Sequence, residues 1–390
     1  MTRPRLPGPV VTPAGVAVFS RIITHGPVPR IEIARATGLS QAAVTKAVTP
    51  LIESGYVQET SVPRGAAGAG RPVNPLVVIA NRAFAIGVKI TADEVIGVVT
   101  DLCARIVGSV HRTVPAAGAS EVLAIVVEVV EALRSSSGVR PDRIVGVGVA
   151  VSGDVDPHSG VIRLSPLLGW RDVNLGEELE QRIGLPVVIE NDVRALTIAE
   201  HWFGMGVDAA SFAVVTIGAG VGCGIYVNGE VVAGAYGVSG EIGHLPLAGG
   251  DLVCTCGRRG CVETAASSQA IVRRMHALTG RECELAEIVD LAHAGDAAAQ
   301  QAFAEAGEVI GSALAAMVNL VGPQLVVIAG EGVAEYDLYA DHIRHAFQEH
   351  AFGAAGECEL VVRSHTFDDW ARGAAVVVIR GMVRSGETSG

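Results

Sequence analysis

The sequence lacks any apolar run long enough to cross a membrane. Each long apolar stretch, including residues 122–130, is interrupted by Glu or Gly before it reaches the roughly 18 residues that a membrane span needs. The N-terminal segment MTRPRLPGPVVTPAG is basic and rich in proline, and the apolar stretch of a secretory signal does not follow it. We therefore expect a cytoplasmic protein that contacts no membrane.

The composition also excludes large-scale disorder. Hydrophobic residues make up 49% of the 390 residues and the mean hydropathy is +0.42, which supplies enough apolar surface for sizeable cores. At about 150 residues per domain, the length predicts two to three domains. The seven cysteines form an odd number, and three of them fall within eight positions. This pattern favours a metal site in a reducing compartment over a set of disulfides.

Negative charge is unevenly distributed along the chain. The net charge is −12, yet residues 1–80 hold eight Arg or Lys against three acidic side chains and carry +5, which leaves −17 for the other 310 residues. A small basic module on an acidic body is typical of a protein that binds DNA and something else. Charge alone leaves open a basic face that has no partner.

Residues 1–80 carry the pattern of a winged helix-turn-helix. Residues 16–24 predict one helix, and residues 30–37 predict a second that ends at Gly38. Ser40 then has the position of an N-cap for a third helix, which begins at Gln41. The wing is expected as a strand, a loop rich in Gly, Pro and Arg, and a second strand: residues 55–57, 63–72 and 73–79.

In such a module the helix that starts at Gln41 enters the major groove of DNA, with its N-terminal end first. Gln41, Thr45 and Lys46 would then face the DNA. Gln41 can bond bidentately to adenine, whereas Lys46 can equally contact a phosphate. The intervening side chains are expected to pack inward or fill space: Ala42, Val44 and Val48.

Two arginines of the predicted wing, Arg64 and Arg71, are candidates for contact with DNA. Arg71 stands between Gly70 and Pro72 on a narrow extended backbone, which can enter an A·T-rich minor groove. A flexible linker is the alternative explanation of this segment. Pro50 lies late in the recognition helix and is expected to end or kink it.

From about residue 84 the chain alternates β-rich runs with helical stretches, which predicts an α/β body. Two sets of three strands resemble one another, one within residues 84–110 and one within residues 212–234, and each begins one half of the body. Two similar lobes predict a cleft between them, where loops at strand ends bind ligands. Further strands are expected near residues 144–151, 187–190, 325–329 and 360–363, and helices near 121–135, 193–203, 297–320 and 369–383.

The strongest chemical signal is His244 followed by Cys254, Cys256 and Cys261. Three thiolates and one imidazole form a four-ligand set that suits tetrahedral Zn²⁺ and leaves no coordination position open. We therefore expect a structural zinc, with unrelated buried thiols as the alternative. The remaining cysteines are expected to be ordinary buried residues: Cys103, Cys223, Cys283 and Cys358.

Glu190, Asn191 and Asp192 stand where an apolar strand meets the start of a helix. Carboxylate and amide side chains at a strand end can form paired hydrogen bonds to the vicinal hydroxyls of a sugar. Asp192 can equally cap the helix that follows it. Glu241 and Glu263 flank the metal motif, so a bound metal would hold two further carboxylates in a fixed frame.

Residues 216–224 are rich in glycine and predict a strand, a turn and a strand. Backbone N–H groups in such a turn can come close to a phosphate. Ordinary tight hairpins carry the same glycines, so phosphate binding and a plain hairpin both stay open.

Together, the winged module, the duplicated body and the metal segment from Gly240 to Glu263 resemble the ROK family of repressors and sugar kinases. The Cys-x-Cys-Gly-x-x-Gly-Cys-x-Glu element is highly specific, and the resemblance covers nearly the whole chain. It implies an actin-like, ribonuclease-H-type α/β fold of two lobes on residues 81–390, after a winged helix-turn-helix domain on residues 1–80. It also implies zinc on His244 and the three cysteines of the motif.

The resemblance further implies a sugar pocket in the cleft. Gly153 would approach the sugar from one lobe, and His244 would bind zinc through one ring nitrogen and face the sugar with the other. In kinase members the residue that matches Asp192 is the general base, which takes the hydroxyl proton before attack on ATP. The implied sugar contacts are Gly153, Asn191, Asp192, Glu241, His244 and Glu263.

The ATP side of the kinase site departs from the family pattern. Kinase members carry Asp-x-Gly-Gly-Thr where residues 89–93 read Lys-Ile-Thr-Ala-Asp, and Gly-Thr-Gly where residues 218–220 read Gly-Ala-Gly. The adenosine-side glycines are interrupted by Glu331. Phosphoryl transfer depends almost wholly on positioning and charge stabilisation, so we expect these losses to abolish it.

We therefore expect a sugar-responsive transcription regulator that acts as a repressor. It would bind double-stranded DNA as a homodimer or a dimer of dimers, and its operator affinity would change when a sugar closes the cleft. One alternative is an active ATP-dependent sugar kinase with an accessory DNA-binding domain. The other is a constitutive DNA-binding protein with a vestigial pocket. Residue types do not identify the sugar, because epimers differ by one hydroxyl.

Overall fold

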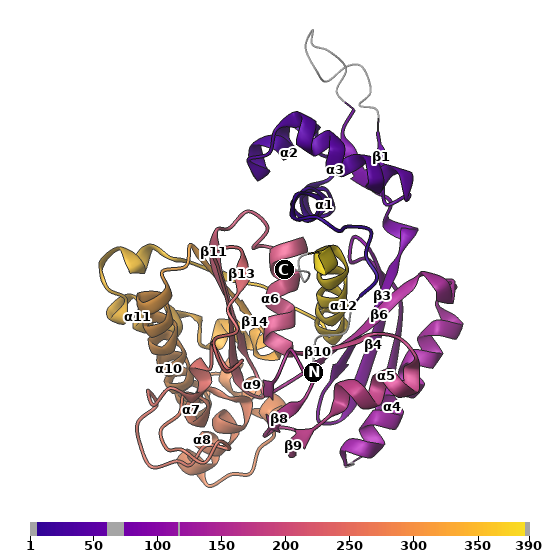
Figure 1. Cartoon of the computed structure of the whole chain (residues 1–390). Coiled ribbons are helices and arrows are strands. Elements are labelled where there is room, and N and C mark those ends of the chain that lie inside the picture. The colour runs from indigo at the N-terminus through magenta and orange to yellow at the C-terminus, as the bar shows by residue number, and fades with distance from the viewer. Residues whose placement is uncertain (1–5, 61–73, 116–117, 387–390) are drawn as a thin grey trace. The chain divides into compact units, whose positions relative to one another are not determined.

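A computed structural model describes residues 6–60, 74–115 and 118–386 (Figure 1). Its contacts divide the chain into two compact units. Unit 1 consists of residues 1–207 and 367–390, and unit 2 consists of residues 208–366. Because the C-terminal segment returns to unit 1, the chain passes through unit 2 as one continuous insertion.

The N-terminal part of unit 1 consists of three helices and a hairpin. The helices are α1 (Pro13–His25), α2 (Arg30–Thr37) and α3 (Gln41–Glu53), and β1 (Val57–Glu59) pairs antiparallel with β2 (Leu76–Val78). Gly38 ends α2 in the left-handed conformation, and the Ser40 hydroxyl accepts a hydrogen bond from the Ala43 N–H at the start of α3. The sequence pattern of a helix-turn-helix followed by a hairpin is therefore confirmed, with a second strand shorter than expected.

Two details of the recognition helix were predicted wrongly. Pro50 does not end α3, which continues to Glu53 because Leu51 is buried in the module core and the Ser54 N–H bonds to the Pro50 carbonyl. Ala42 is exposed, whereas Val44 and Val48 are fully buried as expected. A helix buries only the stripe that its 3.6-residue period turns inward, and position 42 lies outside that stripe.

The body of unit 1 is built on a five-stranded sheet in the order β10-β6-β3-β4-β5. Strands β3 (Phe84–Ile90), β6 (Ile144–Val151) and β10 (Val187–Asn191) are parallel, and β4 (Glu94–Asp101) and β5 (Ile106–Thr113) complete an antiparallel meander with β3. One sheet face forms a core with α4 (Ala119–Ser136) and α5 (Leu175–Ile183). The C-terminal helix α12 (Phe367–Val383) covers the other face beside α6 (Asp192–Phe203) (Figure 1).

A smaller three-stranded sheet follows β6 in the chain and was missed by the sequence patterns. It consists of β7 (Asp154–Val155), β8 (Ile162–Ser165) and β9 (Trp170–Val173). These strands have two to four residues, too few to show a reliable alternation of apolar and polar side chains.

The segment before α1 fastens the N-terminal part of unit 1 to its body. Leu6 is only 5% exposed and lies against two glycines, Gly146 on β6 and Gly381 on α12. An ideal Cβ on Gly381 would stand 2.5 Å from Leu6 Cδ1, and one on Gly146 would stand 2.8 Å from Leu6 Cδ2. Both glycines are therefore needed to admit the leucine.

Unit 2 repeats the sheet topology of unit 1. Its sheet has the order β13-β12-β11-β14-β15, in which β11 (Ser211–Ile217), β12 (Val221–Val227) and β13 (Glu230–Val231) form an antiparallel meander. Strands β14 (Leu325–Ala329) and β15 (Glu359–Val362) continue in parallel from β11. Each sheet thus adds two parallel strands to its meander, which confirms the internal duplication and the α/β fold class.

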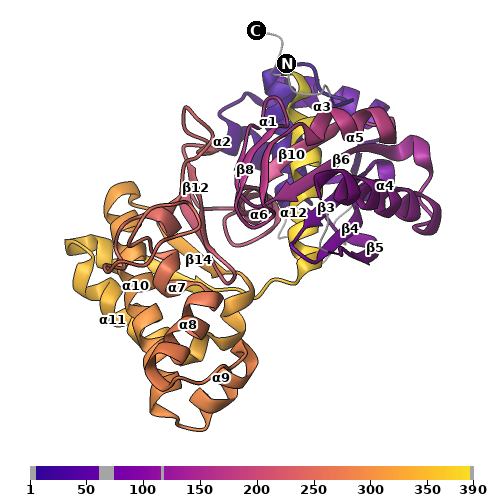
Figure 2. The same cartoon turned by 90° about the horizontal axis from the view of Figure 1, so that it is seen from below.

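The helices of unit 2 pack around its longest helix, α10 (Ala297–Val321), with α11 (Ala340–His350) alongside it (Figure 2). Helices α7 (Glu263–Ala266), α8 (Ser268–Thr279) and α9 (Leu285–His293) also contact α10. By length and composition, α10 is the one helix in the described part of the chain that could cross a membrane. Half of its most apolar window is buried, and Phe303, Ile310 and Leu314 belong to the core of unit 2.

Candidate functional site

The candidate metal ligands of unit 2 come together as the sequence predicted. The ligand atoms of His244, Cys254, Cys256 and Cys261 all lie within 4.8 Å of one another. Cys254 Sγ is 3.6 Å from His244 Nδ1, and Cys256 Sγ is 3.7 Å from Cys261 Sγ. A tetrahedral zinc site requires about 3.8 Å between sulfurs and about 3.5 Å between sulfur and nitrogen, given Zn–S and Zn–N bonds near 2.3 and 2.0 Å. The four residues therefore fit such an ion without rearrangement.

The chemistry of the thiols also favours a bound cation. Burial, together with the neighbouring Cys256 and Cys254 sulfurs, raises the pKa of the Cys261 thiol to about 12. Metal coordination requires the deprotonated thiolate, so binding of a cation would release protons from this cluster. All seven cysteines are free of disulfides.

The two ring nitrogens of His244 face different partners. Nδ1 lies on the side of the thiols, and Nε2 lies 3.8 Å from Glu241 Oε2. Gly240, in the left-handed region at φ +91°, and Gly243 let this loop pack on β12, since a Cβ on either would stand 2.2 Å from a β12 carbonyl oxygen. The division of roles expected for the imidazole is geometrically available.

Glu263 connects the metal cluster to the glycine-rich loop between β11 and β12. Its Oε2 lies 3.8 Å from Cys254 Sγ, and its Oε1 accepts a hydrogen bond from the Val221 N–H at 3.1 Å. Glu241, His244 and Glu263 are thus brought together within unit 2, as the sequence predicted. The loop itself places two backbone N–H groups near carboxylates of the same chain.

The second of these carboxylates is Glu331, whose role the sequence patterns missed. Its Oε1 accepts a hydrogen bond from the Ala219 N–H at 2.6 Å, and a Cβ on Gly218 would stand 2.1 Å from the Glu331 carboxyl carbon. A backbone N–H in a glycine-rich loop is the kind of donor that binds phosphate oxygens. Here a carboxylate oxygen occupies that donor.

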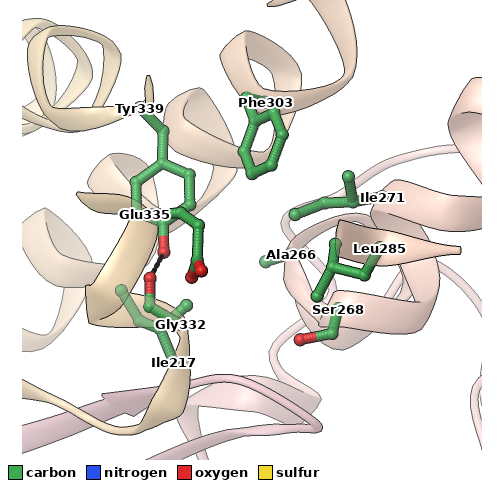
Figure 3. Close-up of a pocket in the computed structure, with 9 residues that line it drawn as sticks. All are labelled: Ile217, Ala266, Ser268, Ile271, Leu285, Phe303, Gly332, Glu335 and Tyr339. Carbon is green, nitrogen blue, oxygen red and sulfur yellow. Dashed lines mark hydrogen bonds between the residues drawn. The ribbon is translucent and has the colours of Figure 1, made fainter. Parts of the chain in front are cut away.

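A small cavity lies next to this loop, lined by residues of unit 2 (Figure 3). Its volume of about 10 Å³ has room for roughly one water molecule. Phe303 and Tyr339 form part of its wall, and the Tyr339 hydroxyl donates a hydrogen bond to the Gly332 carbonyl (Figure 3). Burial raises the pKa of Tyr339, so this hydroxyl remains a donor at neutral pH.

The polar residues predicted in unit 1 gather at the carboxyl ends of its parallel strands. Asn191 Nδ2 donates to the Gly153 carbonyl at 3.0 Å, and Asn191 Oδ1 accepts from the Arg194 N–H at 3.1 Å. Asn191 is therefore the N-cap of α6, and the alternative role of Asp192 as that cap is wrong. Glu190 is buried in an ion pair with Arg194 at 3.0 Å.

Asp192 has a cationic partner that the sequence did not reveal. Its Oδ2 pairs with the ammonium of Lys89, which comes from β3, and its Oδ1 accepts a hydrogen bond from the Val193 N–H at 2.9 Å. Both side chains of the pair are nearly buried, and Lys89 Nζ also lies 5.1 Å from the centre of the Trp370 ring. The partners are 103 residues apart in the chain, so local patterns carry no sign of the contact.

The recognition helix α3 presents a polar surface. Gln41, Thr45 and Lys46 are all exposed, as expected for side chains that reach DNA. The Thr45 hydroxyl is used within the helix, where it donates to the Gln41 carbonyl at 2.9 Å. Arg64 and Arg71 lie outside the described residues.

One prediction about cysteine burial is partly wrong. Among the four cysteines outside the cluster, only Cys223 is buried, and its burial raises the thiol pKa to about 12. Cys103, Cys283 and Cys358 are half-buried, because each lies in or beside a surface turn or helix end instead of a strand interior.

The fold and site together define a two-lobed α/β protein of the sugar kinase type, with an N-terminal helix-turn-helix and hairpin. Residues 85–380 match the model of the ROK family, so the chain belongs to this family. The match begins directly after the N-terminal module.

Relatives that cover the whole chain are transcription regulators. The DNA-binding transcriptional dual regulator NagC of Escherichia coli K12 is 30% identical over 376 residues, which cover 94% of this chain and 92% of that protein. The xylose repressor of Bacillus subtilis is 25% identical over 365 residues, which cover 93% and 94%.

Solved structures show the same division. A ROK family transcriptional regulator, described as a homologue of the E. coli Mlc protein, superposes with a TM-score of 0.81 at 25% identity and covers 96% of this chain and 98% of its own. A ROK family glucokinase from Streptomyces griseus, in complex with glucose and AMPPNP, has a TM-score of 0.67 at 27% identity. It covers 76% of this chain and 99% of its own, so the kinase accounts for the body alone.

Proposed function

We propose that this protein is a sugar-responsive transcriptional repressor with an N-terminal DNA-binding domain on residues 1–80 and a sugar-binding body on residues 81–390. The observation that carries the proposal is the difference in coverage. Regulators match the chain nearly from end to end, whereas a glucokinase of almost complete coverage on its own side leaves about a quarter of this chain unmatched.

The N-terminal module is assigned to double-stranded DNA. Gln41, Thr45 and Lys46 on the exposed face of α3 would reach the major groove, and Arg64 and Arg71 of the wing would add contacts in the minor groove. A winged module of this kind reads one half-site, so a homodimer, or a dimer of dimers, on a pseudo-palindromic operator follows from the geometry. Such a protein acts in the cytoplasm, where free cysteines persist.

The body is assigned to a free sugar. Gly153, Asn191 and Asp192 of unit 1 and Glu241, His244 and Glu263 of unit 2 supply carboxylate, amide and imidazole groups suited to hydroxyls. The names of the relatives suggest xylose, N-acetylglucosamine and glucose as the first sugars to test. Sugar binding would change operator affinity by its differential affinity for the two conformational states.

Zinc is the metal that suits the cluster best, held by His244 Nδ1 and the thiolates of Cys254, Cys256 and Cys261. Four protein ligands leave no open position, so the ion would be structural. It would hold the loop that carries Glu241 and the helix that begins at Glu263.

We assign no phosphoryl transfer to the body. The Glu331 carboxylate occupies the Ala219 N–H, a donor that would otherwise be available to a phosphate oxygen, and it brings negative charge to that position. The adjoining cavity has room for about one water molecule, far less than a purine base needs. Both features oppose nucleotide binding.

Thermal unfolding of the zinc-loaded protein with D-xylose, N-acetylglucosamine, D-glucose and ATP tests this proposal. A ligand that binds only the native state raises Tm by mass action, so we expect a shift with one sugar and none with ATP. Asp192→Asn should abolish the sugar shift, whereas Asp142→Asn, the same substitution in an exposed turn, should retain it. An ATP shift with turnover of a hexose would establish a kinase instead. An absence of any sugar shift would contradict the sensor.

A further inference from the structure

Lysine is rare in this chain, which has 27 arginines but only two lysines, Lys46 and Lys89. Lys46 lies on the exposed face of α3, whereas Lys89 is only 5% exposed in the middle of unit 1. A buried ammonium is costly unless it is paired. Its position therefore needs a reason within the fold.

The register of β3 places Lys89 on the face of the sheet that carries α12 and α6. Ile86, Val88 and Ile90 belong to the core on the opposite face, so alternate positions turn toward α12. At Gly87 the helix approaches so closely that a Cβ would stand 1.9 Å from the Ala371 carbonyl oxygen. Lys89 lies one step further along this face, past Trp370, and reaches the Asp192 carboxylate at the start of α6.

The contacts of the pair leave hydrogen-bonding capacity on both partners. An ammonium has three N–H donors, and the contacts of Lys89 in the described structure are the Asp192 carboxylate and the Trp370 ring face. Each carboxylate oxygen of Asp192 has two acceptor sites, of which one is used by Val193 N–H or by Lys89. A hydroxyl both donates and accepts, so the pair is matched to it.

A second observation points to the same edge of the sheet. The Ser152 hydroxyl oxygen is buried and has no hydrogen-bond partner among the described residues. Ser152 directly follows β6, which lies between β3 and β10, so its hydroxyl is carried at the carboxyl ends of the strands that hold Lys89 and lead into Asp192. Buried hydroxyls without partners are uncommon, and one at the carboxyl edge of parallel strands fits a ligand site.

From these observations we propose that Lys89 and Ser152 are specificity-determining residues that complete the sugar site around Asp192. Lys89 neutralises and holds the carboxylate, so the site takes a neutral sugar hydroxyl without a divalent cation. Ser152 supplies one further hydrogen bond. The inference rests on the proposed function, because it assumes that the body binds a sugar.

Calorimetric titration of the zinc-loaded full chain with D-xylose, N-acetylglucosamine and D-glucose, with and without Mg²⁺, tests this inference. We expect Lys89→Met to weaken the bound sugar by about tenfold or more and Ser152→Ala by about fivefold, with no dependence on Mg²⁺. The matched control is Arg112→Met, which removes an exposed cation from β5 of the same sheet and should leave affinity within about twofold. Lys89→Met should add little to the loss caused by Asp192→Asn, since the lysine acts through that carboxylate.

Ser152→Ala separates a ligand contact from a structural role. Removal of a buried hydroxyl without a partner should leave Tm unchanged or raise it, so loss of affinity at full stability supports the inference. Wild-type affinity in both Lys89→Met and Ser152→Ala would overturn it while the proposed function stands. Failure of the unmodified protein to bind any of the three sugars would overturn the proposed function, and this inference with it.

Discussion

Leu6 offers a direct test of how the N-terminal module is attached to the body of unit 1. Its two methyl groups are held against Gly146 on β6 and Gly381 on α12, so backbone forms both walls of the slot. Backbone in a strand and a helix moves inward less readily than side chains. A cavity left by Leu6→Ala would therefore stay largely open.

The magnitude follows from that rigidity. Leu→Ala substitutions cost about 2.7–5.0 kcal/mol, and the cost rises with the volume that stays empty. We expect about 3–4 kcal/mol from the free energy of unfolding of unit 1. At roughly 2–4 °C per kcal/mol for a unit of this size, the midpoint should fall by about 6–16 °C.

The assay uses the placement of the tryptophans. Trp170, Trp202 and Trp370 are the three tryptophans of the chain, and all belong to unit 1, so their fluorescence reports the unfolding of that unit. Gly381→Ala should rescue Leu6→Ala by about 1–2 kcal/mol, because its Cβ enters the vacated space and alanine favours a helix over glycine. The rescue should exceed the effect of Gly381→Ala alone. A Leu6→Ala protein within about 0.5 kcal/mol of the parent would refute the reasoning.

Three other changes have equally definite outcomes. Chelation of the metal, or Cys254→Ser, should lower the melting temperature of unit 2 in calorimetry while the tryptophan transition moves little, since the ligands all lie in unit 2; an equal fall of both transitions would contradict this assignment. Glu331→Ala should free the Ala219 N–H and allow inorganic phosphate to raise Tm, whereas Glu335→Ala beside the same cavity should not; a phosphate response in the parent would count against the carboxylate as the occupant. Lys46→Ala should reduce the salt slope of DNA binding by about one, while Gln41→Ala should cost about 1–3 kcal/mol on the selected site and relax its sequence preference. Equal losses on selected and random DNA for Gln41→Ala would remove it as a base-reading residue.

Local signals explain what could be predicted from the sequence. Gly38 and Ser40 mark the ends of two consecutive helices, and the structure places α2 and α3 on either side of them. The long helices α4, α6, α10 and α12 begin and end within two residues of their predicted bounds, because their apolar periodicity extends over several turns. The metal cluster was predictable because its cysteines are close in sequence.

Long-range contacts explain what could not be predicted. Lys89 and Asp192 are 103 residues apart, and Ala219 and Glu331 are 112 residues apart. Both contacts depend on which strands are neighbours in a sheet, which periodicity does not encode. At residues 89–93 and 331, the sequence showed only that glycines or a carboxylate typical of kinases were absent. The structure adds that each position now holds a charged side chain with a specific partner.

The boundary between the two proposed domains stays a prediction. The hairpin ends at β2, and β3 begins at Phe84, so residue 80 falls in the short connection between them. Arg82 in this connection donates to the Ser54 carbonyl at 2.9 Å and stacks over the Tyr56 ring at 4.8 Å. The module is therefore joined to the body by side-chain contacts as well as by the chain itself.

The central claim is that one chain couples sugar binding to DNA binding. The most direct test selects duplexes from a random-sequence pool with the zinc-loaded protein and then measures the Kd of the enriched DNA at fixed salt, with and without the sugar that raises Tm. Coupling free energies of about 1–3 kcal/mol predict a change in Kd of at least fivefold, and the DNA should change the Kd of the sugar by the same factor. Enriched DNA whose Kd does not change when the sugar saturates the body would contradict the account.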